Sequence, residues 1–334
     1  MLWTLTDKEK KQSSEAFIRT YLLQPDGFIR TTITDRADEY LSESMGLWML
    51  YLVESDEPKR FKTQVKTLQA EFLTADHLVT WQIIGHKKAS ANALIDDIRI
   101  VQALYTASEK WNKPTYQSLA DQMSRSIARY QTIEGILTDF VETSNKEVGT
   151  ELTLSYIVPQ ALDLMVERKL LSNDVYLKTQ QVLLDAPITE NGLFPRSYST
   201  RTSRYTYDAD VHMIDQFYTG YHRAVWDGDV TGLMSFTKQV FLDGGHKLYG
   251  RYDRTTRKPT VTFESAAVYA LASMMFREVG ETEFADQLLN RMEQLAVQDK
   301  ASPYYGGYID VQTKDTHSFD NLLALLAEQQ SEMK

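Results

Sequence analysis

The sequence predicts an all-α fold, an (α/α)6 toroid in which six inner helices alternate with six outer helices in a single domain over residues 1–334. Two observations predict it. Amphipathic segments with one apolar stripe recur along the chain, and segments that are apolar nearly all round lie between them. The alternation has a period of about 55 residues, which is enough for one helix of each kind with its loops.

The amphipathic segments are expected to form the outer ring. Leu119, Met123 and Ile127 repeat every fourth residue, and a similar stripe runs from Phe284 to Leu295. Such stripes bury one face of a helix and leave the other in water. The expected outer helices begin near Lys8, Pro58, Thr115, Asn173, Asp229 and Glu281.

The apolar segments, among them residues 47–53, 266–276 and 322–326, are expected to form the inner ring, because such helices must be buried on most sides. Polar residues stand near the starts of six of these segments, at intervals of 52 to 59 residues. They are Glu43, Asp97, Tyr156, Asp208, Glu264 and Asp320.

In a toroid the starts of the inner helices converge on one face, which would gather these side chains. A helix N-terminus has free N–H groups and partial positive charge, so it stabilises carboxylates. The same preference places Asp and Glu in the first turn of ordinary helices. The position of these acids near helix starts is therefore explained by helix capping as well as by catalysis.

Composition excludes several classes of function. The net charge of −10 argues against a nucleic-acid partner, which would require clustered Lys and Arg. The chain has no cysteine, no stretch of about 20 apolar residues that could span a bilayer, no metal-binding His spacing and no phosphate-binding Gly-rich loop. We expect no metal and no cofactor.

Five segments resemble motifs of the family 8 glycoside hydrolases, in the order that the family has. Ser42–Gly46 is similar to the family's Ser-Glu-Gly-Met-Gly, and Leu78–Trp81 to Leu-x-x-Trp. Asp97–Leu104 resembles the aspartate-led inner helix, and Leu154–Pro159 resembles Pro-Ser-Tyr-Phe-x-Pro. Gly192–Pro195 followed by Tyr207–Ala209 is similar to Gly-Leu-x-Pro and Tyr-Asp-Ala. The last third of the chain matches only by its helix pattern.

The resemblance implies an inverting hydrolase with Glu43 as general acid, Asp208 as general base and Asp97 binding the sugar beside the scissile bond. Apolar neighbours of Glu43 would desolvate its carboxyl and raise its pKa, whereas the base must stay ionised in a more polar place. Asp210 and Asp215 lie close enough in sequence to be the base instead of Asp208.

Aromatic and charged side chains around these acids are expected to bind substrate. Trp81, Tyr156 and Tyr207 are candidates for stacking on sugar rings, although an aromatic residue of a helical protein is more often part of the core. Trp48 is assigned to the core. Arg204 and Asp215 are further candidates for substrate contacts.

Two loops are expected to lie near the cleft. The stretch 196–206, which contains Arg204, is expected to be an exposed loop, either a solvated connection or a lid. Residues 304–308, followed by Thr316, His317, Asp320 and Asn321, could close the same face, although caps and turns explain much of that segment.

The chain departs from the family pattern at sugar-binding positions. Ser44, Ile95, Arg99, Arg196 and Val211 stand where the family has Gly, Asp, Asp, Asp and Arg. These departures argue against plain cellulose as the substrate. The chain resembles a divergent branch of the family that is encoded in bacterial exopolysaccharide operons. That resemblance implies endo-type cleavage of a β-1,4-linked N-acetylmannosamine polymer of the biofilm matrix.

That resemblance also implies an extracellular or cell-surface enzyme, with a possible lipid tether and no membrane span within this chain. The N-terminus lacks a basic segment followed by an apolar one, so a signal segment would have been removed from this sequence. We expect a monomer whose partner is its polysaccharide substrate. The alternatives are another (α/α)6 enzyme, such as a polysaccharide lyase, or a non-catalytic polysaccharide-binding protein.

Overall fold

The structure is a computed structural model that describes residues 13–332, and it is mostly helical, which confirms the all-α prediction. The outer helix expected near Lys8 begins outside the described residues. Among residues 13–332 no helix is both long and apolar enough to cross a membrane.

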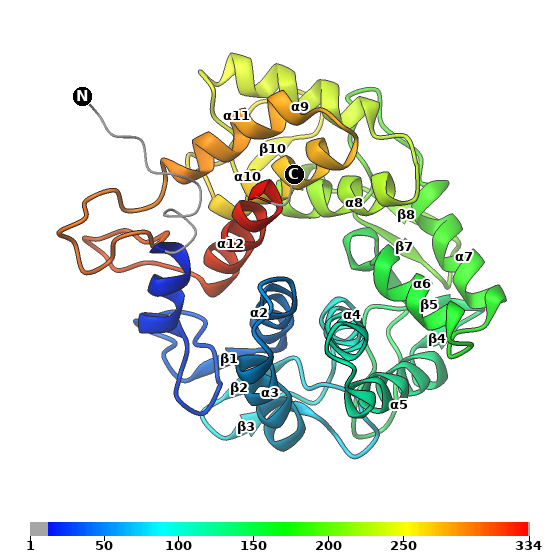
Figure 1. The fold of residues 1–334 in the computed structure, drawn as a ribbon. Coiled ribbons are helices and arrows are strands. Elements are labelled where there is room, and N and C mark those ends of the chain that lie inside the picture. Colours follow the sequence, from blue (N-terminus) through cyan, green and yellow to red (C-terminus); the bar gives the residue numbers. More distant parts are fainter. Residues whose placement is uncertain (1–12, 333–334) are drawn as a thin grey trace.

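The buried helices contact one another in chain order around a central axis (Figure 1). Helix α2 contacts α4, α4 contacts α6, α8 contacts α10, α10 contacts α12, and α12 returns to α2. The short 3-10 helix η3 (Leu154–Tyr156) contacts α8 and α4 and so joins the two sides. The bounds are α2 Ser42–Glu54, α4 Leu94–Trp111, α6 Pro159–Glu167, α8 Met213–Val225, α10 Ala266–Glu278 and α12 Ser318–Glu332.

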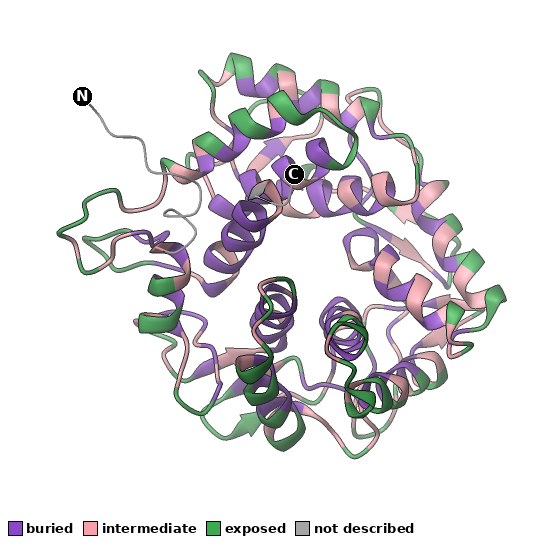
Figure 2. Ribbon diagram, viewed as in Figure 1, coloured by how far each residue is buried: buried purple, intermediate pink, exposed green. Residues whose placement is uncertain are grey.

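The amphipathic helices lie outside this ring, with their exposed faces toward solvent (Figure 2). They are α3 (Pro58–Thr67), α5 (Pro114–Tyr130), α7 (Asn173–Leu184), α9 (Thr231–Asp243) and α11 (Thr282–Glu293). Proline opens α3 and α5, where its missing N–H costs no hydrogen bond and its fixed φ suits a helix. Two π-helical turns, η1 (Ile18–Leu22) and η2 (Leu68–Phe72), complete the helical part.

Short antiparallel strands connect the helices. β1 (Glu39–Leu41), β2 (Gln82–Ile84) and β3 (Lys87–Lys88) form one sheet, and β6 (Glu151–Thr153), β7 (Ser197–Ser199) and β8 (Arg204–Thr206) form another. Two pairs, β4 (Thr132–Ile133) with β5 (Ile136–Leu137) and β9 (Asp210–His212) with β10 (Arg251–Asp253), complete the set.

The core fills the space between the two layers of helices. Trp48, predicted to be core, is fully buried and stacks on Tyr51 with the ring centroids 5.1 Å apart. Phe61 on α3 is also fully buried and packs edge-on against Trp111 and Tyr116. One aromatic cluster thus joins α3, α4 and α5.

Two predictions about the region before α8 are wrong. Residue Asp208 does not begin an inner helix, because β9 pairs with β10 and delays the helix start to Met213. The stretch 196–206 is not a loop, because β7 and β8 form a hairpin that extends the sheet begun by β6. The turn of the hairpin covers residues 200–203, of which Thr200 is buried and the other three are exposed.

Serine side chains tie the starts of neighbouring inner helices together. Ser42 Oγ donates to Asp96 Oδ2 (2.7 Å) between α2 and α4, and Ser44 Oγ lies 2.7 Å from Ser318 Oγ between α2 and α12. Ser265 Oγ donates to Asp320 Oδ1 (2.6 Å) between α10 and α12. These bonds hold several of the predicted polar helix starts at one end of the ring.

Candidate active site

A cleft of about 780 Å³ opens at the end of the ring where these helix starts meet. Glu43 from α2 and Asp320 from α12 lie in its wall, together with His212 from β9 and Glu264 from the segment before α10. Residues 308–310 and 315–317 line it as well, so the segment expected to close this face does reach the cleft. Three helix starts and two loops therefore share one cavity.

The carboxyl of Glu43 is in an environment that favours its protonated form. Glu43 is in the first turn of α2, and every residue from Ser44 to Met49 is buried. Burial raises the pKa of Glu43 to about 8; the nearby charge of Asp96 also raises it, Arg99 lowers it and Asp320 raises it. A carboxylic acid that stays protonated at neutral pH and faces a cleft can donate a proton to a bound ligand.

Asp96 and Arg99 lie directly behind Glu43 and were not predicted as site residues. Asp96 is buried and accepts from Ser42 Oγ, and Arg99 Nη1 lies 3.4 Å from Asp96 Oδ1. Burial raises the pKa of Asp96, and both Arg99 and the Ser42 hydrogen bond oppose that shift. Two sequence signals pointed to this pair. They were the adjacent acids at 96 and 97 and the departure from the family pattern at Arg99.

Asp97, predicted to bind sugar, is fully buried and does not line the cleft. Its Oδ2 accepts from the Val79 N–H (3.3 Å) and from Asn92 Nδ2 (3.1 Å), so Asp97 holds the loop before α4. Burial raises its pKa well above the usual range despite these bonds. In this structure Asp97 supports the loop before α4, and its contact with a sugar stays a prediction.

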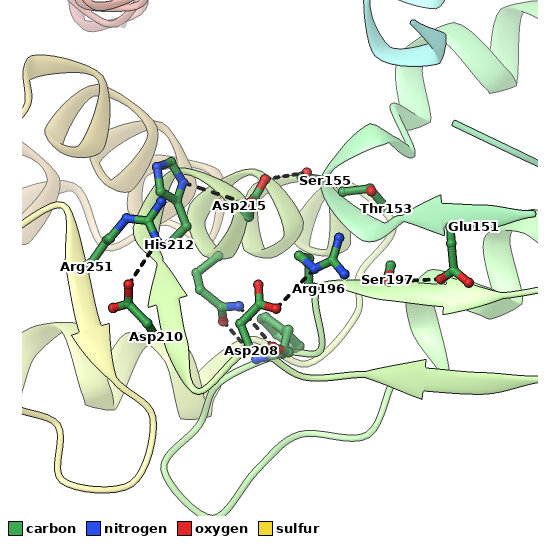
Figure 3. A network of polar contacts seen from close by, with 12 residues as sticks. Glu151, Thr153, Ser155, Arg196, Ser197, Asp208, Asp210, His212, Asp215 and Arg251 are labelled. Atoms are coloured by element: carbon green, nitrogen blue, oxygen red, sulfur yellow. Dashed lines mark hydrogen bonds and ion pairs between the residues drawn. The ribbon is translucent and has the colours of Figure 1, made fainter. Parts of the chain in front are cut away.

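The acids before α8 are in a more polar setting, shown in Figure 3. Asp208 Oδ1 lies 3.2 Å from Arg196 Nε, and both side chains are partly exposed. Asp210 Oδ2 lies 2.9 Å from Arg251 Nη1, and its Oδ1 accepts from Thr260 Oγ1 (2.5 Å). The hydrogen bonds from Thr260 and Arg251 lower the pKa of Asp210. Both oxygens of Asp210 are thus engaged, one by Arg251 of β10 and the other by Thr260 of the segment that follows β10.

Asp215 is in the first turn of α8, with its carboxylate turned toward η3 (Figure 3). Its Oδ1 accepts from Ser155 Oγ (2.8 Å), and its Oδ2 lies 3.7 Å from His212 Nδ1. Burial lowers the pKa of His212, although Asp215 opposes that shift. Of these two residues, His212 lines the cleft.

Tyr156 lies between the two groups of acids. Burial raises its pKa, and the charges of Asp96, Asp139, Asp215 and Glu43 raise it further. Its hydroxyl therefore experiences the field of acids from α2, α4 and α8 together. Tyr156 is the predicted aromatic residue whose surroundings connect the Glu43 side of the site with the Asp215 side.

The other predicted substrate contacts lie in three different places in the structure. Trp81 is 39% exposed, and its carbonyl accepts from the Ser42 N–H (3.0 Å), so it adjoins the start of α2. Tyr207 donates its hydroxyl to the Pro187 carbonyl (2.6 Å) and carries Arg254 over its ring. Arg204 is exposed on β8. None of the predicted contacts Trp81, Tyr156, Tyr207 and Arg204 is among the residues that line the cleft.

Two features of the cleft were not anticipated. Phe263 is 55% exposed and lines the cavity, a position suited to stacking on a sugar ring. Glu264, taken only as an inner-helix start, is bound by Arg291 through both oxygens (2.8 and 2.6 Å). Burial would raise the pKa of Glu264, but Arg291 and Tyr269 lower it overall, so Glu264 is held ionised.

Metal chemistry has no evident site in the described part of the chain. No group of three or more His, Cys, Asp or Glu side chains among residues 13–332 is arranged to hold a metal ion. The chemistry available in the cleft is that of carboxyl groups, imidazoles and hydroxyls.

Comparisons with known proteins identify the class. The chain is 37% identical over 318 residues to "Putative lipoprotein YdaJ" of Bacillus subtilis, covering 95% of this chain and 86% of that protein. Its structure matches PssZ of Listeria monocytogenes with a TM-score of 0.80 and 27% identity, over 95% of this chain and 94% of PssZ. No family model matches the sequence.

Two further solved structures extend the likeness. An alpha-amylase of Clostridium perfringens matches with a TM-score of 0.88 and 25% identity, over 96% of this chain and 97% of that one. Endoglucanase Cel10 of Klebsiella pneumoniae, a family 8 glycosyl hydrolase, matches with a TM-score of 0.69 over 97% and 100% of the two chains. At 14% identity, the second likeness concerns the fold alone.

The fold and these relatives define a glycoside hydrolase, an enzyme that acts on glycosidic bonds. The chain belongs to the same family as YdaJ, and it shares its fold with PssZ and with the family 8 glycoside hydrolases.

Proposed function

We propose that the protein is an inverting, endo-acting glycoside hydrolase built on a single (α/α)6 toroid. The observation that carries the proposal is that Glu43, a part-buried acid with a pKa near 8, opens into a cleft at the converging starts of the inner helices. The closed chain of contacts from α2 through to α12 supports the toroid.

In the proposed reaction Glu43 donates its proton to the glycosidic oxygen as the bond from that oxygen to the anomeric carbon breaks. A water molecule attacks that carbon from the opposite face and gives a proton to Asp208, so the configuration inverts. Asp208 pairs with Arg196 and is partly exposed, and it lies outside the residues that line the cleft around Glu43. Solvent then returns the proton from Asp208 to Glu43.

Substrate contacts are proposed for Trp81, Tyr156, Phe263 and Asp215. The two exposed rings would stack on sugar faces, and Tyr156 would bind a sugar hydroxyl between the acid and α8. Asp215 is the competing candidate for the base, because it shares the field at Tyr156 with Glu43.

The proposed substrate is a β-1,4-linked bacterial exopolysaccharide of the biofilm matrix, with an N-acetylmannosamine-type backbone. This substrate is the one implied by the sequence resemblance to the branch of exopolysaccharide operons, and we propose that the enzyme acts as a monomer. The similarity to a protein named as a lipoprotein supports a cell-surface location with a lipid tether. The similarity to an alpha-amylase supports a second candidate, an α-1,4-linked glucan.

A reducing-sugar assay on a panel of polysaccharides tests the proposal. The panel contains purified exopolysaccharide, starch, carboxymethyl cellulose and xylan, and each is incubated with wild type and with Glu43→Gln. We expect release of oligosaccharides from exopolysaccharide by wild type and a loss of about 10³-fold in Glu43→Gln, the scale of a missing general acid. Circular dichroism must show that both proteins fold.

The pattern of products separates the alternatives. If starch is the only polysaccharide cleaved, the substrate is the second candidate, an α-1,4-linked glucan. Equal turnover by Glu43→Gln and wild type would contradict the assignment of the acid. Products with unsaturated ends that absorb in the ultraviolet would identify a lyase instead.

A further inference from the structure

A second groove, of about 630 Å³, lies outside the ring between α3 and α5, and it shares no lining residue with the cleft. Four lysines surround it: Lys59, Lys62 and Lys66 on α3, and Lys113 just before α5. All four are exposed. The three on α3 follow helical spacing, so they lie along one face over roughly 10 Å.

These lysines are free to bind an external anion. Within residues 13–332 none of the four ammonium groups has a carboxylate partner. Two acids on the loop before α3 are already engaged, since Asp56 accepts from Trp111 Nε1 (2.7 Å) and Glu57 pairs with Arg60. A concentrated positive charge on a chain with a net charge of −10 is a local feature that the overall composition does not explain.

The floor of the groove adds rigid aromatic surface. Trp111 and Tyr116 line it, and each packs edge-on against the buried Phe61 with ring centroids 5.2 Å apart. The hydrogen bond to Asp56 fixes the Trp111 ring. Aromatic rings held in place beside cations suit a ligand that has both apolar sugar faces and negative groups.

Helix geometry strengthens the positive field at one end of the groove. Both α3 and α5 begin there, with Pro58 and Pro114 in their first turns, and neither start has a side-chain cap. Their free N–H groups and partial positive charges add to the charge of Lys59 and Lys113.

We propose that the α3–α5 groove binds an anionic polysaccharide, at a site separate from the cleft. The negative groups would be carboxylates or phosphodiesters along the sugar chain, and the lysines would pair with them while Trp111 and Tyr116 contact the rings. A concave channel between two helices fits a polymer strand better than a flat lipid surface. The site would hold the enzyme against a charged glycan matrix while the cleft acts independently.

Binding measurements with the full chain test this site. Glu43→Gln, which leaves the groove intact, is titrated with polygalacturonate, phosphomannan, neutral dextran and vesicles of phosphatidylglycerol. We expect binding to one or both anionic glycans, and the two distinguish carboxylate from phosphodiester recognition. Adding Lys62→Gln and Lys66→Gln to Glu43→Gln should weaken that binding at least tenfold. Raising the salt concentration should weaken the binding of Glu43→Gln with all four lysines kept.

The matched control removes the same charge elsewhere, by Lys169→Gln and Lys300→Gln, which are exposed and lie outside the groove. It should change the affinity less than twofold, and the groove variant should keep wild-type turnover when Glu43 is restored. Equal weakening in both double variants, binding to dextran as tight as to the anionic glycans, or lysine-dependent binding to vesicles alone would each overturn the proposal.

Discussion

The carboxyl groups at the starts of α2 and α4 and those before α8 have the same chemistry but opposite surroundings. Glu43 and Asp96 lie among buried residues, and burial raises the pKa of both. Asp208 and Asp210 are exposed enough to meet water and pair with Arg196 and Arg251. The difference shows how one fold places carboxyl groups in both dry and polar surroundings, which the proposed acid and base would require.

Three separate substitutions test which acid near the start of α8 is the general base. They are Asp208→Asn, Asp210→Asn and Asp215→Asn. We expect Asp208→Asn to lower kcat by about 10³-fold, because the general base would be lost. Asp210→Asn should cost far less, since both oxygens of Asp210 are already engaged by Arg251 and Thr260. Turnover on the polysaccharide is measured for all three. Near-normal turnover by Asp208→Asn with a large loss in Asp215→Asn would move the base to Asp215.

The α2 side predicts a pH dependence. Glu43 must be protonated to act, and its pKa is about 8, so kcat/KM should fall about tenfold for each pH unit above 8. The measurement is a pH profile of kcat/KM between pH 5 and 10 on a soluble substrate. A profile that is flat through pH 9 would contradict a titrating acid at this position.

Asp96 should shift the pH dependence of kcat/KM without taking part in the reaction. Its charge raises the pKa of Glu43, so Asp96→Asn should move the alkaline limb to lower pH. Asparagine retains an oxygen to accept from Ser42 Oγ, which preserves the tie between α2 and α4. A purely structural role would lower kcat at every pH and leave the limb in place.

The smallest effect expected is on stability. The pKa of Glu43 is about 8 in the folded protein against 4.5 ordinarily, so its contribution to stability is fully present below pH 4.5 and is lost as pH rises to 8. Glu43→Gln should therefore gain in Tm relative to wild type between pH 5 and pH 8.5, by roughly 2 °C or more. Thermal melts at the two pH values measure it.

The control for that measurement is Glu190→Gln, which removes an exposed glutamate. Its Tm difference from wild type should not change with pH. If Glu43→Gln behaves in the same way, Glu43 is not in a desolvated site.

Much of the helical pattern was readable in advance. Helices α3 and α7 begin at the predicted Pro58 and Asn173, and α2 and α12 begin within two residues of Glu43 and Asp320. These boundaries depend on local effects, namely apolar periodicity, proline at a helix start and acids in a first turn, which a sequence displays directly.

The errors lie where distant segments pair. Nothing near Asp208 in the sequence shows that residues 251–253 will pair with residues 210–212 and postpone α8. Likewise Asp96 and Asp97 are adjacent in the chain, and only the packing of α2 against α4 turns the first toward Ser42 and the second toward Val79 and Asn92.

The sequence by itself determined an acidic, cysteine-free, helical chain with acids near the starts of its apolar segments. Tertiary structure decided which of those acids are buried, which are paired with arginine and which open into the cleft. The physical reason is that helix formation depends on neighbours a few residues away, whereas a carboxyl's pKa depends on solvent access and on charges from other helices. Glu43 was recognisable from its local motif, but its raised pKa comes from Asp96 and Asp320 as well as from burial.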